Sequence, residues 1–93
     1  DNFNKILKKI DSEAHDLTIS QTALQIFSSY CIYIYPNQIN GDVDELALAL
    51  YVTSKKYLGD LSIDIYIEAS KREQDSSKVV NYFNLINKAL SDI

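Results

Sequence analysis

The seven residues 46–52 (LALALYV) are apolar on every side of a helix, and they constrain the fold more than any other stretch of the chain. Helix boundaries flank them. Asp42 and Glu45 have the three-residue spacing of a capping box, and Gly59 suits the left-handed position that follows a helix. A helix with no polar face must be covered on all sides by other elements. We therefore expect residues 46–52 to lie in the buried central helix of an all-α bundle.

Apolar residues at helical spacing predict two helices before this segment. The first covers residues 3–15. The second begins near Thr18 and Gln21, which have capping-box spacing, and must end before Pro36. The end of the second, YCIYIY, also has strand propensity, but we assign it to the helix. The residues expected to face inward are Phe3, Ile6, Leu7, Ile10, Ala14 and Leu17, then Ala23, Ile26, Phe27, Tyr30, Cys31 and Ile34. Residues 36–41 (PNQING) read as a loop.

Two elements are expected after the apolar segment. In residues 61–70 (LSIDIYIEAS), apolar and polar residues alternate as in a half-buried strand, but a lone strand would have no pairing partner in this sequence. Ser62 could instead cap a short helix. The last helix should begin between Asp75 and Ser77, with Val79, Phe83, Ile86 and Leu90 facing inward.

Length and composition indicate one globular domain over residues 1–93, with 46% hydrophobic and 24% charged residues. A formal net charge of −4 argues against binding DNA mainly by bulk electrostatics. The single cysteine suits an intracellular, reducing compartment, and no apolar run is long enough for a membrane span. Because the chain begins without methionine, we expect it to be a fragment of a longer protein.

Three stretches resemble the core repeats of transcription factor IIB, which have the cyclin-like fold. SQTALQIFSSY is similar to the second helix of such a repeat, and ELALALYVTSKKYLG is similar to its third. DLSIDIYIEASKREQDSSKVVNYFNLINKAL is similar to its closing helix-turn-helix. The resemblance covers nearly the whole chain, and it favours a helix over residues 61–70. It implies a five-helix cyclin-like bundle around a buried central third helix, with the last two helices forming a helix-turn-helix.

The same resemblance implies a transcription-initiation adaptor that binds protein partners, namely a TATA-binding protein or RNA polymerase, and promoter DNA as a weaker contact. Its compartment would be the nucleus in a eukaryote. The chain departs from the family pattern in two respects: it has GDLS where the family has a PRT-like turn, and it is acidic where the family is basic.

Two alternatives stay open. The third helix also resembles that of cyclins, in which a lysine and a glutamate contact a protein kinase. Lys55 matches the lysine, but Phe83 stands near the glutamate position. The other alternative is a helical interaction module with an unrelated partner, since fold alone does not determine function.

The helix-turn-helix suggests contacts with DNA or a partner. The first residues of its second helix would reach base edges, and cations in the turn would reach phosphates. These candidate residues are Lys71, Arg72, Ser76, Ser77, Lys78 and Asn81. A capped, solvated helix face explains them more simply, because nearby carboxylates would repel a phosphate backbone. A second candidate partner surface consists of Lys5, Lys8, Lys9, Lys55 and Lys56.

The sequence gives no sign of an enzyme, a cofactor or a metal site. His15 is the only histidine, and it fits a cation at a helix end. Cys31 lies on an apolar face and fits the core. The carboxylates of Asp42, Asp44 and Glu45 are explained by capping and the helix dipole.

Overall fold

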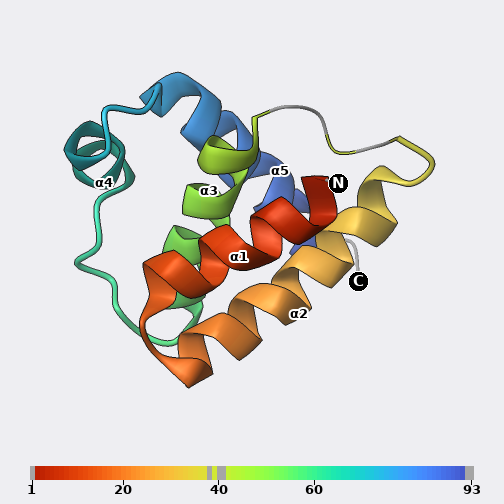
Figure 1. The fold of residues 1–93 in the computed structure, drawn as a ribbon, viewed down its shortest axis with the longest axis horizontal. Coiled ribbons are helices and arrows are strands. Elements are labelled where there is room, and N and C mark those ends of the chain that lie inside the picture. The colour runs from red at the N-terminus through yellow and green to blue at the C-terminus, as the bar shows by residue number, and fades with distance from the viewer. Residues whose placement is uncertain (1, 38, 40–41, 92–93) are drawn as a thin grey trace.

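The computed structural model describes residues 2–37, 39 and 42–91, apart from the side chain of Phe3. This part of the chain contains five helices and no strand, which confirms the all-α prediction (Figure 1). The helices are α1 (Asn2–Ala14), α2 (Leu17–Ile34), α3 (Val43–Tyr57), α4 (Ile65–Lys71) and α5 (Ser76–Ser91). The Cα radius of gyration is 12.0 Å, close to the value of about 12 Å expected for a single domain of this length.

Helix α3 packs against all four other helices. In Figure 1, α1 crosses in front of it and α5 lies behind. Of residues 46–52, all are buried except Tyr51, which is half-buried. Two buried hydroxyls next to this stretch need partners, and they find them within the helix. Thr53 Oγ1 donates to the Ala49 carbonyl and Ser54 Oγ donates to the Leu50 carbonyl, each at 2.7 Å.

The C-terminal boundary of α3 is the one predicted from Gly59. This glycine has φ of +104°, and the backbone N–H groups of Gly59 and Asp60 donate to the carbonyls of Lys56 and Lys55. These two bonds form a Schellman motif, which supplies donors to carbonyls of the last turn that have no donor within the helix. The N-terminal boundary is also correct, but the Asp42 side chain does not cap the helix. Its carboxylate accepts hydrogen bonds from α5 instead.

Helix α2 is helical to Ile34, so the strand alternative for its aromatic end is wrong. Its predicted cap needs a correction. The N-cap is Asp16, whose carboxylate accepts from the backbone N–H groups of Thr18 and Ile19. Starting the helix earlier leaves Leu17 in its first turn with 73% of its surface exposed, so the prediction that Leu17 faces inward is also wrong.

Helix α4 confirms the helical assignment within residues 61–70, although it begins at Ile65. Its N-cap is Asp64, which accepts from the N–H groups of Tyr66 and Ile67, so the suggestion that Ser62 caps it is wrong. After α4 the chain turns through Glu73, a non-glycine residue in the left-handed region with φ of 54°. The turn spans four residues, 72–75, and α5 follows it directly.

The core lies where α1, α2 and α5 meet α3. The predicted inward residues Ile6, Phe27 and Ile86 are fully buried. Cys31, Ile34, Phe83 and Leu90 are half-buried and pack against the same cluster. The predicted inward position of the Phe3 side chain, and residues 38, 40 and 41 of the expected loop, lie outside the described part of the chain.

Candidate partner-binding surface

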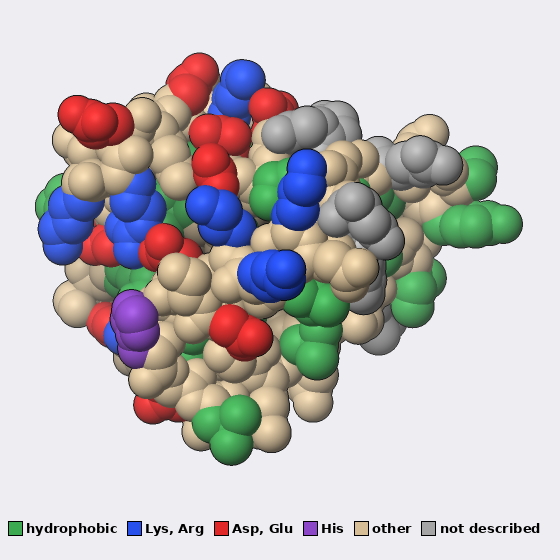
Figure 2. All heavy atoms as spheres, viewed as in Figure 1, with side chains coloured by type: hydrophobic (Ala, Val, Ile, Leu, Met, Phe, Trp, Pro, Cys, Tyr) green, Lys and Arg blue, Asp and Glu red, His purple; other side chains and the backbone are tan. Residues whose placement is uncertain are grey.

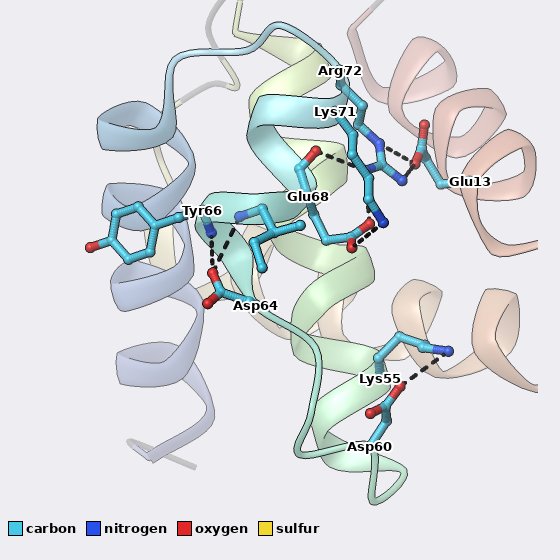
Figure 3. Close-up of polar contacts among 9 residues, drawn as sticks. Glu13, Lys55, Asp60, Asp64, Tyr66, Glu68, Lys71 and Arg72 are labelled. Carbon is cyan, nitrogen blue, oxygen red and sulfur yellow. Dashed lines mark hydrogen bonds and ion pairs between the residues drawn. The ribbon is translucent and has the colours of Figure 1, made fainter.

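The turn between α4 and α5 holds Arg72, one of the cations predicted to contact phosphate. Figure 3 shows its side chain pointing toward Glu13 of α1. Arg72 Nε donates to Glu13 Oε2 at 2.7 Å, and Nη1 donates to Glu68 Oε1 at 3.0 Å. The guanidinium also lies 5.8 Å from the ring centroid of Tyr51. Arg72 thus joins α1, α3 and α4, and its fork of donors is engaged within the domain.

The electrostatics of this cluster favour the ionised forms. Partial burial works against the charge of Glu68, but hydrogen bonds from Arg72 and Lys71 lower the pKa of Glu68 below its usual range. For the same reason the pKa of Arg72 is raised despite its partial burial. Lys71 Nζ lies 3.3 Å from Glu68 Oε2. Lys71, the last residue of α4, and Arg72 in the turn are therefore both paired with carboxylates of the domain itself.

The start of α5 holds the other predicted contacts. Lys78 Nζ donates to Asp42 Oδ1 at 3.2 Å, and this bond raises the pKa of Lys78. Tyr82 also donates to Asp42, at 3.1 Å. Ser77 is bonded through its backbone N–H and its hydroxyl to the carboxylate of Asp75, which lowers the pKa of that aspartate. Ser76 is half-buried and Asn81 is exposed. Their predicted contact with DNA stays a prediction.

Lys55 and Lys56 lie near the end of α3. Lys55 Nζ lies 3.4 Å from Asp60 Oδ2. The two side chains point toward one another in Figure 3. Hydrogen bonds from Ser62, with Lys55 adding to them, lower the pKa of Asp60. Lys55 and Asp60 line a cleft of about 440 Å³ between α3 and α4. Lys56 has a different partner, because its ammonium lies 5.9 Å from the ring centroid of Phe83.

The remaining lysines, Lys5, Lys8 and Lys9, share one groove between α1 and the start of α3. Its volume is about 610 Å³, and its other lining residues are Asn2, Ser12, Val43 and Asp44. Lys9 Nζ lies 3.0 Å from Asp44 Oδ1. Neither Lys5 nor Lys8 forms an ion pair with any carboxylate in the described part of the chain. Figure 2 shows basic side chains over α1, whereas those over α4 are interspersed with acids.

Sequence reasoning missed the acceptors of these ion pairs. Glu13 is 59 residues from Arg72, and Asp42 is 36 residues from Lys78, so each pair forms only when the helices pack. The Glu68–Arg72 pair is different. Its four-residue spacing on a helix is a recognised signal and could have been used to predict it.

The chain has one histidine, His15, and one cysteine, Cys31. His15 is exposed after α1, and burial raises the pKa of the half-buried Cys31 thiol. Among the described residues, no three His, Cys, Asp or Glu side chains are grouped to hold a metal ion. No helix in residues 2–37 or 42–91 is long and apolar enough to cross a membrane.

Comparison of the chain with models of known protein families, with curated proteins and with solved structures finds no match. The structure defines an all-helical domain, with five helices in residues 2–37 and 42–91.

Proposed function

We propose that this chain is an adaptor domain of the transcription factor IIB type, with a cyclin-like arrangement in which α3 is the central helix. The packing of α3 against all four other helices supports the arrangement. The succession of a short α4, a four-residue turn and a long α5 supports the helix-turn-helix. In this proposal the domain acts by holding protein partners of transcription initiation, a TATA-binding protein or RNA polymerase.

One observation favours protein over DNA as the main ligand. Lys71, Arg72 and Lys78, the cations in and next to the turn of the helix-turn-helix, are all paired with carboxylates of the domain. Releasing counterions from DNA requires cations that can move to phosphates. Cations that already neutralise Glu68 and Asp42 contribute little to such binding, and the net charge of −4 opposes it further.

A retention experiment with purified components tests this function. The chain is immobilised and exposed separately to purified TATA-binding protein and to RNA polymerase from the same source organism. We expect one of the two to be retained at physiological salt and not by a chain carrying Leu50→Ala, which disturbs the packing of α3. Retention of neither protein, by a chain that circular dichroism shows to be folded, would contradict the proposal.

A further inference from the structure

We propose that the groove between α1 and the start of α3 binds an acidic, amphipathic helix of a protein partner. This inference deepens the proposed function, because it specifies the chemistry of the partner, and it rests only on the protein-binding part of that function. Two properties of the groove carry it: its local charge, which is opposite to that of the whole chain, and an apolar component in its lining.

The groove is a positively charged site on an acidic domain. Three lysines and one aspartate line it, whereas the chain as a whole has a net charge of −4. Only Lys9 is neutralised there, by Asp44 at 3.0 Å. Lys5 and Lys8 are exposed and have no ion-pair partner among the described residues, so their charges are available to a ligand. A ligand with carboxylates is complementary to this charge.

The spacing of the lysines suits a helix. Lys5 and Lys8 are three residues apart, which places them on the same face of α1, about 4.5 Å apart along its axis. Carboxylates three residues apart on a second helix have the same separation. Half-buried Val43 and the aliphatic stems of the lysines provide apolar surface beside the charges. A partner helix would therefore carry an apolar side chain next to its acids.

Nucleic acid fits the same groove less well. A duplex presents phosphates over a long surface, and its affinity depends on many cations that are free to reach them. Asp44 lines this groove, so a polyanion lying over Lys5 and Lys8 would meet its carboxylate. A peptide avoids this repulsion because it can place its few carboxylates at the lysines only.

The test uses the whole 93-residue chain, labelled with ¹⁵N, in an NMR titration. The probe is an alanine-based helical peptide of about 16 residues with pairs of Glu three residues apart and an adjacent Leu. Control probes are the same peptide with Lys in place of Glu, and a short oligothymidylate. We expect the acidic peptide to shift the amide signals of α1 and the start of α3, and the Lys peptide to shift none of them.

Variants assign the binding to the groove. Charge reversal at both Lys5→Glu and Lys8→Glu should weaken binding about tenfold or more, since it replaces two attractions with two repulsions. Asp44→Asn should tighten binding about two- to fivefold, because it releases the charge of Lys9. The matched control is Lys88→Glu, which reverses an exposed lysine in the last turn of α5 that has no ion-pair partner among the described residues, and it should leave binding unchanged.

Three results would overturn the inference: no shifts with the acidic peptide, equal binding by the double variant, or tighter binding of the oligothymidylate through the same lysines. The adaptor function is tested separately by the retention experiment. If TATA-binding protein or polymerase is retained equally by the wild type and the double variant, the adaptor function stands and the groove is not its contact. If neither is retained while the peptide maps to the groove, the groove stands and the adaptor function fails.

Discussion

Shortening one side chain of α3 tests the packing on which the fold depends. Leu50 is 0% exposed and lies in the core cluster between α3 and its neighbours. Replacing a buried leucine with alanine costs about 2–5 kcal/mol in free energy of unfolding, and more when the surroundings cannot collapse into the cavity. Because four helices contact α3, we expect Leu50→Ala to lie in the upper part of this range, about 3–5 kcal/mol.

This loss is a large fraction of the domain's total free energy of unfolding. A domain of 93 residues has a total stability of about 5–14 kcal/mol. A loss of about 3 kcal/mol lowers Tm by about 12–24 °C. Urea denaturation followed by circular dichroism measures it, with an unchanged m value showing that the unfolding remains two-state. The matched control, Leu17→Ala at a position 73% exposed, should change stability by less than about 0.5 kcal/mol. A loss below about 1 kcal/mol for Leu50→Ala would refute the burial argument.

Three further predictions concern charge and backbone. The pKa of Glu68 is lowered in the folded state, so ionised Glu68 stabilises the fold above its unfolded-state pKa of about 4.3, and this stabilisation is lost as pH falls through the folded value. Glu68→Gln should therefore flatten the acid limb of a plot of stability against pH. An unchanged acid limb would contradict the lowered pKa. Arg72→Ala should cost about 1–3 kcal/mol, because it leaves the partly buried Glu13 carboxylate without its donor and leaves Glu68 with Lys71 alone. A double-mutant cycle with Glu13→Gln should give a non-zero coupling energy, and full additivity would show that this ion pair contributes nothing. Glu73→Gly should raise the free energy of unfolding by about 0.5–1 kcal/mol, since Glu73 has φ of 54° and glycine avoids that strain. The control is the reverse change, Gly59→Ala, at a position with φ of +104° and open space around it. Gly59→Ala should lower the free energy of unfolding.

The helices were predictable because their signals are local. The apolar run of α3 and the glycine after it predicted a helix whose bounds the structure confirms. The exact caps were less predictable. Asp16 and Thr18 are both good capping residues, as are Ser62 and Asp64, and in each case the aspartate is the cap. Neighbouring capping residues compete locally, and the packing of the finished helix selects between them.

The strand-like pattern of residues 61–70 shows a different limit of prediction from sequence, namely that of apolar periodicity in a short segment. Alternation of apolar residues predicted a strand as well as a helix, and only the lack of a pairing partner and the resemblance favoured a helix. In the structure Leu61 is 80% exposed and Ile67 is 54% exposed, whereas Ile63 and Ile65 are half-buried against the core, so the alternation marks a buried face only in part. Periodicity in a short segment was a poor guide because few residues of this segment enter the core.

The residues of the candidate surfaces were predicted from the sequence, but the side chains that surround them in the structure were not. Lys78 was a candidate for contact with a DNA groove, yet it is held by Asp42 at the start of α3. Lys5 and Lys8 were expected to be part of a basic face, and the structure adds the groove and its apolar lining. Ion pairs between distant helices depend on tertiary approach, which no local pattern in the chain encodes.

We expect this domain to bind protein partners and to contact DNA only weakly by itself. The affinity for DNA is measured by fluorescence anisotropy of a labelled promoter duplex, titrated with the domain alone and then with TATA-binding protein present. We predict that the domain alone binds with Kd no tighter than about 10⁻⁴–10⁻⁶ M at physiological salt, and that TATA-binding protein makes this binding tighter. Sub-micromolar affinity of the domain alone, abolished by Lys78→Glu, would contradict the claim and show that α5 reads DNA directly.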